Sequence, residues 1–286
     1  MESKSEGKKT PAGSPGKERA SQSPPKRTPS PQTDDLLPGH HWAQAPLKVV
    51  DIGTGTGLWA VDFGDKFPNC EVIGTDISPI QPTWVPPNVK LWARYYYDCT
   101  QPFTFAPDSI DFFHMRYMTG SLSVQGWYDL FKEAFRCTKP GGYFESFEAA
   151  PFFTSDDGTV TETSALSQWG KLFVEGGKKI GATFSMVVDG TQTKGMEEAG
   201  YVDIEERDFK VPMGRWPKDP KLKELGTFAY AAIATDIEGY VLYMANLQGW
   251  TKEEVGVYAA HLRREMNNTD IHGFYKVKVV WGRKPE

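Results

Sequence analysis

The stretch VVDIGTGTGLWAVDF, residues 49–63, constrains the fold of this chain more than any other. An apolar run ends in Asp51, glycines follow at the alternate positions 53, 55 and 57, and a segment with helical spacing comes next. A strand that turns through glycines into a helix lets a ligand approach the backbone closely, because the turn carries almost no side chains. The spacing is G-x-G-x-G, which differs from the G-x-G-x-x-G that holds a dinucleotide pyrophosphate. It therefore favours a ligand that lies along the loop without a pyrophosphate.

The order of strands and helices indicates one open α/β sheet. Apolar runs alternate with segments of helical spacing up to about residue 150, as in a parallel sheet covered on both faces. Such connections are right-handed, so the carboxyl ends of the strands share one edge, where open α/β sheets bind ligands. The expected strands are 47–53, 70–78, 89–98, 110–117 and 143–149, and the expected helices are 57–67 and 126–142.

Apolar spacing also predicts which faces the first helices bury. In the first helix, Leu58, Val61 and the segment 65–67 have helical spacing, which indicates its apolar side. In the second, Pro140 and the two glycines after it should end the helix, whose expected apolar stripe is Leu130, Phe131, Ala134 and Phe135.

Helical spacing continues in the second half of the chain. One helix is expected at 165–181, and most of 213–270 should be helical. Within the latter, Thr251 and Glu254 form a predicted capping box. The stripe that follows it, expected to face the core, is Val255, Ala259, Leu262 and Met266.

Two further strands are expected near the end of the chain. The segment 191–212 predicts a short helix, a turn at Gly200 and then a strand, whose inward residues would be Val202, Ile204 and Phe209. The alternating segment 274–285 predicts a last strand. We therefore expect an antiparallel pair to complete the sheet.

The first 40 of the 286 residues differ from the rest in composition. They are rich in Ser, Pro and Lys and almost free of apolar residues, so they cannot offset the entropy cost of folding, and we expect a disordered tail at 1–40. Its scattered basic residues are typical of a solvated tail, although they also suit a nuclear import signal. We expect 41–286 to be a single domain in which 151–180 and 213–270 cover the substrate.

Charge and cysteine content restrict the location and the partners. The net charge is −5, from 32 basic and 37 acidic residues, which gives no strong sign of nucleic-acid binding. No apolar run is long enough to cross a membrane, and no signal peptide is apparent. The cysteines, Cys70, Cys99 and Cys137, are odd in number and fit a reducing, cytoplasmic or nuclear compartment better than a disulfide or metal framework.

Two acids stand at the ends of the second and third expected strands. Asp76 comes 25 residues after Asp51 and could accept hydrogen bonds from both hydroxyls of a ribose. Asp98 ends the third strand, where it could accept from an exocyclic amino group of adenine. A glycine loop and two acids on consecutive strand ends indicate a site for an adenosine with a tail that carries no phosphate. As alternatives, Asp76 could cap a helix and Asp98 could belong to a turn.

These residues resemble the class I S-adenosylmethionine-dependent methyltransferases, most clearly over residues 47–150. The segments DIGTGTGLWAVDF, GTDISPIQPTWVPPN and CTKPGGYFE are similar, more narrowly, to fungal methyltransferases related to the velvet-complex regulator of secondary metabolism. The resemblance implies a Rossmann-like seven-stranded sheet, mostly parallel with an antiparallel last strand and helices on both faces. It also implies S-adenosyl-L-methionine as cofactor, no metal, and a small-molecule methyl acceptor.

The same resemblance implies a role for particular residues. Asp51 and the loop would surround the methionyl part and the ribose, Asp76 would hold the ribose hydroxyls, and Arg116 could pair with the cofactor carboxylate. The complete implied cofactor set is Asp51, Gly53, Thr54, Gly55, Gly57, Asp76, Ile77, Asp98, Cys99, Met115 and Arg116.

Catalysis needs little beyond this site, because a sulfonium methyl is already activated and positioning can supply much of the rate. Where the acceptor must lose a proton, position alone makes Glu148 and His114 the candidate catalytic residues, although either could be a hydrogen-bonded structural residue. An aromatic and apolar wall for the acceptor is expected from Trp169, Phe173, Trp216, Phe228, Tyr230, Tyr240, Tyr243 and Met244.

The segment before the first strand departs from the family pattern. Relatives carry helices there that help to close the cofactor site, whereas DDLLPGHHWAQAPLK, residues 34–48, is too short for two helices. The alternatives to a small-molecule enzyme are therefore a regulatory methyltransferase in a nuclear protein complex and a non-catalytic fold that has lost its lid. A nicotinamide-dependent enzyme is disfavoured by the glycine spacing.

Overall fold

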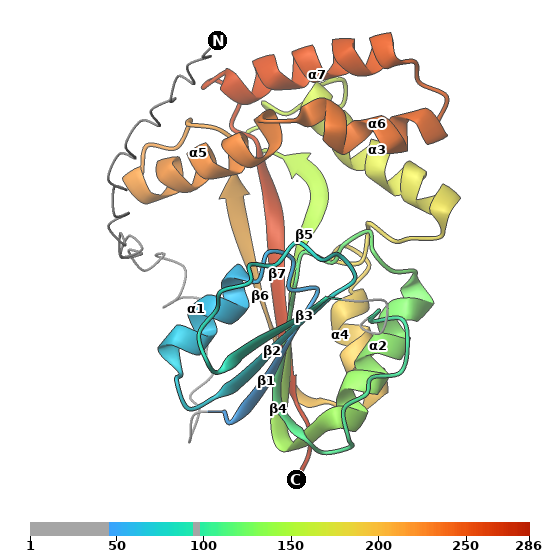
Figure 1. Ribbon diagram of the computed structural model, residues 1–286. Coiled ribbons are helices and arrows are strands. Elements are labelled where there is room, and N and C mark those ends of the chain that lie inside the picture. The colour runs from blue at the N-terminus through green and yellow to red at the C-terminus, as the bar shows by residue number, and fades with distance from the viewer. Residues whose placement is uncertain (1–45, 94–97) are drawn as a thin grey trace, which may run out of the picture. The chain divides into compact units, whose positions relative to one another are not determined.

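The computed structural model describes residues 46–93 and 98–286 (Figure 1). The disordered tail predicted for 1–40 lies outside the described residues. Within them, a seven-stranded sheet has the order β3-β2-β1-β4-β5-β7-β6. The strands are β1 (Lys48–Ile52), β2 (Glu71–Asp76), β3 (Val89–Ala93), β4 (Ile110–Arg116), β5 (Thr138–Thr154), β6 (Val202–Pro212) and β7 (Phe274–Arg283).

The pairing of these strands confirms the predicted fold class. Strands β1 to β5 pair in parallel, whereas β7 lies antiparallel between β5 and β6. The helices are α1 (Leu58–Lys66), α2 (Val124–Cys137), α3 (Ala165–Ile180), α4 (Thr191–Ala199), α5 (Pro220–Ala234), α6 (Ile237–Leu247) and α7 (Lys252–Asn267). Helix α1 covers one face of the sheet, and α2 and α4 cover the other (Figure 1). None of the helices in the described part of the chain is long and apolar enough to cross a membrane.

The first helix buries a face other than the predicted one. Leu58 is exposed, and α1 packs on the sheet through Trp59 and Phe63, which stack on each other at 4.8 Å between ring centroids. Both rings approach Phe112 of β4 at 6.3 Å. Trp59 and Phe63 are four positions apart and so share one side of the helix, and Val61 is half-buried beside them.

The second helix buries the predicted residues Leu130, Phe131 and Ala134 but ends differently. It stops at Cys137 and passes directly into β5, so Pro140 lies at the start of a strand and does not terminate the helix. Strand β5 is 17 residues long, far longer than the predicted 143–149, and a register shift interrupts its pairing with β4 near Ile110.

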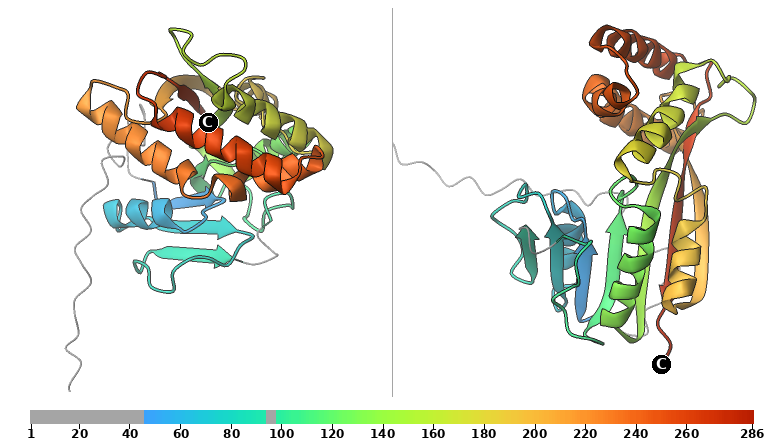
Figure 2. Two further views of the ribbon diagram at one scale, coloured as in Figure 1. Left: turned by 90° about the horizontal axis from the view of Figure 1, so that it is seen from above. Right: turned by 90° about the vertical axis from the view of Figure 1, so that its right-hand side faces the viewer.

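A second hydrophobic core lies beyond the carboxyl ends of the parallel strands. There α3, α6 and α7 pack around the extended end of β5 (Figures 1 and 2). The predicted capping box of Thr251 and Glu254 is present at the start of α7. The buried stripe that follows it is confirmed as Val255, Ala259, Leu262 and Met266.

The inward face predicted for β6 is largely wrong. Val202 and Phe209 are both exposed, because β6 forms the edge of the sheet and few residues cover it. Ile204 is half-buried and contacts the main core. Edge position therefore decides exposure here, against the apolar alternation of the sequence.

Candidate functional site

The glycine loop between β1 and α1 has the backbone geometry that only glycine adopts readily. Gly53, Gly55 and Gly57 have φ angles of 67°, 55° and 77°. The amide of Thr54 donates to the carbonyl of Thr75 at 2.9 Å, and the amide of Gly57 donates to the carbonyl of Thr54 at 2.8 Å. A Cβ added to Gly55 would meet nothing within 4 Å, so this side of the loop is open.

Asp76 lies at the end of β2, beside this loop. Its Oδ2 accepts a 2.8 Å hydrogen bond from the amide of Gly55, and its Oδ1 accepts one of 2.8 Å from the amide of Ser78. Each carboxylate oxygen can accept a second hydrogen bond, so Asp76 keeps acceptor capacity for a ligand hydroxyl. Ile77, which follows it, is exposed at the same edge. The structure therefore brings together the glycine loop and the first predicted acid.

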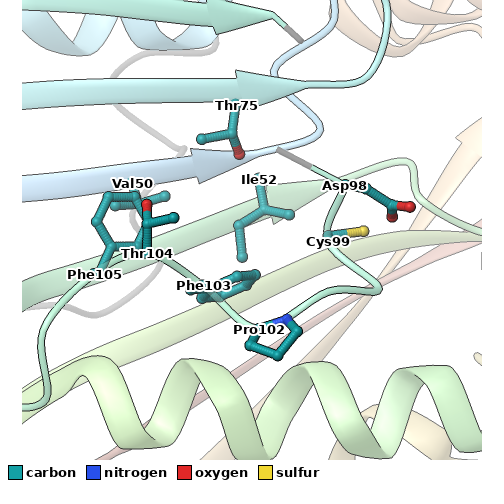
Figure 3. Close-up of a pocket in the computed structure, with 9 residues that line it drawn as sticks. All are labelled: Val50, Ile52, Thr75, Asp98, Cys99, Pro102, Phe103, Thr104 and Phe105. Carbon is teal, nitrogen blue, oxygen red and sulfur yellow. The ribbon is translucent and has the colours of Figure 1, made fainter. Parts of the chain in front are cut away.

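Asp98 and Cys99 lie at one end of a hollow beside β1 and β2, on the side to which the strand arrowheads point (Figure 3). Oδ1 of Asp98 accepts from the amide and hydroxyl of Thr100 at 2.9 and 2.8 Å, so the turn role considered above is real. Within the described part of the chain, Oδ2 of Asp98 has no hydrogen bond. Burial, with the Asp98 carboxylate adding to it, raises the pKa of the Cys99 thiol to about 11, so Cys99 is neutral near pH 7. The hollow is lined by Val50, Ile52, Thr75, Asp98, Cys99, Pro102, Phe103, Thr104 and Phe105.

The two predicted cofactor residues at the end of β4 differ in burial. Met115 is fully buried in the main core, whereas Arg116 is half-buried at the edge. The Arg116 guanidinium lies 5.4 Å from the ring centroid of Tyr117 and 5.8 Å from that of Phe147. No carboxylate pairs with Arg116 among residues 46–93 and 98–286, so it could bind a ligand carboxylate there.

Glu148 is completely buried near the same edge. Its carboxylate accepts hydrogen bonds from the amide of Met118 at 3.0 Å, and from the amide and hydroxyl of Thr119 at 2.8 Å each. Burial raises the pKa of Glu148 to about 7, although these bonds oppose the shift. Glu148 thus holds the turn after β4 and titrates near neutral pH.

His114 lies beneath the glycine loop and is only 1% exposed. Its Nδ1 lies 2.8 Å from Oδ1 of Asp51, whose own exposure is 3%. Neither side chain reaches the surface of the loop. Proton acceptance by His114 or Glu148, and cofactor contact by Asp51, stay predictions.

The predicted aromatic wall is divided between a core and a surface. Trp169 and Met244 are buried in the second core, and Trp216 donates from Nε1 to the carbonyl of Gly273 at 2.9 Å. Phe173 and Tyr230 are partly buried against the same core. The members left exposed on α5 and α6 are Phe228, Tyr240 and Tyr243.

Sequence reasoning missed two groups that shape this site. Gln81 donates from Nε2 to the carbonyls of Gly55 and Ser78 at 2.7 and 2.8 Å, and so ties the loop after β2 to the glycine loop. Met118 packs against Gly53 from the turn after β4. The Gln between two prolines in the segment ISPIQPTW was a visible signal, whereas nothing local to Met118 indicates its long-range contact.

Comparison with known proteins agrees with this geometry. Residues 20–205 match the family model described as a methyltransferase domain, which is well over half of the chain. The chain belongs to this methyltransferase family.

Named relatives of the methyltransferase are fungal. It is 35% identical over 239 residues to methyltransferase pytC of Aspergillus terreus, covering 83% of this chain and 71% of the relative. It is 30% identical over 242 residues to the secondary metabolism regulator LAE1 of Cochliobolus heterostrophus, covering 84% and 77% of the two chains. Among solved structures, the cyclopropane synthase MmaA2 of Mycobacterium tuberculosis aligns with a TM-score of 0.51 at 13% identity, over 84% of this chain and 79% of that one. The last match supports the fold alone.

The cofactor of the methyltransferase is S-adenosyl-L-methionine, and the residues present fit it. The open side of Gly55 leaves room for a ligand against the backbone. Asp76 at the end of β2, and Asp98, which follows β3 (Val89–Ala93) beyond the undescribed residues 94–97, both keep acceptor capacity, as a ribose and an adenine amino group require. Arg116 supplies a cation for a carboxylate.

Proposed function

We propose that this methyltransferase transfers a methyl group to a small, partly apolar acceptor of fungal secondary metabolism. The observation that carries the proposal is the junction of the glycine loop with Asp76, in which the Gly55 amide donates to the Asp76 carboxylate at 2.8 Å. This junction places the glycine loop beside the carboxylate that we propose to bind the ribose. The aromatic residues exposed on α5 and α6 support an apolar acceptor, because such side chains commonly line small-molecule sites.

The residues of the chain would bind, orient and, where needed, remove a proton. The cofactor supplies an activated methyl group on a sulfonium. Asp76 and Asp98 would fix the adenosine, and Arg116 would hold the carboxylate, so that the acceptor can line up with the methyl group. For an acceptor that must lose a proton, we propose Glu148 as the proton acceptor; the turn of Met118 and Thr119 that covers its buried carboxylate would first have to move aside. Its pKa of about 7 is close to the optimum for a general base at neutral pH.

Calorimetry with S-adenosylhomocysteine tests the cofactor site. The wild type should bind one molecule per chain, and Asp76→Ala should weaken binding about 10- to 100-fold, because charge-assisted hydrogen bonds to the ribose are lost. Asp65→Ala removes an exposed carboxylate from α1 and serves as the charge-matched control, with unchanged affinity expected. Absence of binding by the wild type would favour a fold that has lost cofactor binding and would refute the proposal.

A regulatory role is the second candidate, favoured by the match to the regulator LAE1 over 84% of this chain. Under this alternative the methyltransferase works in the nucleus within a protein complex and modifies a protein. Affinity purification from a fungal host separates the two: a stable stoichiometric partner supports the regulatory role, and its absence supports the small-molecule enzyme. A cytoplasmic or nuclear location fits the unpaired state of Cys70, Cys99 and Cys137, and microscopy of a fluorescent fusion tests it.

A further inference from the structure

A chain of buried polar groups lies beneath the glycine loop. Thr54, within the loop, donates from its hydroxyl to Oδ2 of Asp51 at 2.6 Å. Oδ1 of Asp51 lies 2.8 Å from Nδ1 of His114 in β4, and the two residues are direct neighbours in the β1–β4 register. All three side chains are buried. The Asp51 carboxylate therefore connects the loop to the adjacent central strand.

His114 is fixed on two sides. Its ring stacks on that of Trp59, with 3.8 Å between the ring centroids and an interplanar angle of 1°. Trp59 belongs to the first turn of α1, directly after the loop. Its Nε2 lies 4.0 Å from Oε1 of Glu145 in β5, and no hydrogen bond to this nitrogen occurs within the described residues. The imidazole thus contacts the end of the loop, through Trp59, and its middle, through Asp51.

We propose that Asp51 and His114 are positioning residues, which hold Thr54 and so keep the glycine loop in its cofactor-binding conformation without touching the cofactor. Both oxygens of Asp51 are engaged within the protein, and its side chain is sealed from the surface. Direct contact with a ligand would require the loop to open, because the Asp51 carboxylate is covered by it. The inference rests on the proposed function, because it assigns the loop to the cofactor.

The physical reason lies in the three glycines of the loop. Glycine loses more conformational freedom on folding than any other residue, so ordering a loop with three glycines has a large cost in conformational entropy. If ordering were left until the cofactor binds, its entropy cost would reduce affinity. The bond from Thr54 to Asp51 fixes the residue between the first two glycines before binding, and His114 fixes Asp51.

Two substitutions test the chain of contacts from opposite ends. Thr54→Val removes the hydroxyl and keeps the side-chain shape. His114→Phe keeps a ring on Trp59 and removes the nitrogen that faces Asp51. Each should weaken S-adenosylhomocysteine binding about 5- to 30-fold. The double variant should bind only slightly more weakly than the single variant with the lower affinity, because both substitutions interrupt the same chain of contacts from His114 through Asp51 to Thr54. Thr54→Ser and His114→Asn keep a polar group in place and should bind S-adenosylhomocysteine nearly as tightly as the wild type.

Hydrogen exchange of the protein without ligand gives a readout that is independent of binding. The peptide covering residues 53–58 should exchange faster in Thr54→Val and His114→Phe than in the wild type, whereas peptides from β7 should not change. Thr138→Val is the matched control, because Thr138 is also buried and donates its hydroxyl to the carbonyl of Ala134 at 2.8 Å, away from the loop. It should lower the melting temperature and leave both affinity and loop exchange unchanged.

The outcomes are distinct. Wild-type affinity and wild-type loop exchange in both variants would overturn the inference, as would affinity losses that simply add in the double variant. If His114→Phe does not fold, Thr54→Val alone decides. If the wild type fails to bind S-adenosylhomocysteine, the proposed function fails, and loop exchange still tests whether Asp51 and His114 order the loop.

Discussion

The sulfur of Met118 lies directly against the bare α-carbon of Gly53: a Cβ added there would come within 2.3 Å of Sδ. Met118 is itself held by Glu148, through a 3.0 Å bond to its amide. The first glycine of the loop is thus needed for packing as well as for its φ of 67°. The turn after β4 and the loop after β1 therefore pack against each other at the proposed cofactor site.

We expect Gly53→Ala and Gly55→Ala to behave differently. Gly53→Ala should cost about 2 to 4 kcal/mol of unfolding free energy, from the left-handed backbone and the contact with Met118. Gly55→Ala should cost only about 1 kcal/mol, because its Cβ meets nothing within 4 Å. Its methyl group would instead enter the open cradle and weaken S-adenosylhomocysteine binding. Urea denaturation and calorimetry measure the two effects, and equal stability losses would contradict this reading.

Glu148 should make stability depend on pH. Its pKa in the folded protein, about 7, lies above the ordinary value of 4.5, so the folded state holds a proton that the unfolded chain releases at lower pH. Its contribution is therefore fully present below about pH 4.5 and is lost as the pH rises to about 7. Glu148→Gln cannot titrate, so the difference in unfolding free energy between it and the wild type should change by up to about 3 kcal/mol across this range.

Denaturant titrations at several pH values measure this difference. Glu162→Gln, which alters an exposed carboxyl, is the control and should follow the wild type throughout. A constant difference between Glu148→Gln and the wild type from pH 4.5 to 7 would show that Glu148 is ionised over the whole range.

Tyr117 has a strained backbone at the edge of the site. Its φ is 58°, which is uncommon for a bulky residue, and its side chain is 52% exposed. Tyr117→Gly should therefore be more stable than Tyr117→Ala by about 1 kcal/mol, since both remove the ring but only glycine relieves the strain. At Val257, exposed on helix α7, the same pair should show the opposite order, because alanine favours helices. Urea denaturation of the four variants checks this, and an alanine preference at both sites would contradict it.

Local chemistry made much of the cofactor side predictable from the sequence. The strand before the glycine loop and the acid at Asp76 depend on spacing within a few residues, and the parallel order of strands follows from the alternation with helices. The exposure of Phe209 and the extension of β5 to Thr154 depend on which strands are neighbours, and no short stretch of sequence encodes that. For the same reason, the bond between Asp51 and His114, which are 63 positions apart, could not be foreseen.

The most direct test of the account is a crystal structure with S-adenosylhomocysteine bound. We expect the adenosyl group between the glycine loop and Asp98, the ribose hydroxyls within hydrogen-bonding distance of Asp76, and the Asp51–His114 contact unchanged beneath them. Ligand density elsewhere on the molecule, or a ribose without contact to Asp76, would contradict the assignment of this edge of the sheet as the cofactor site.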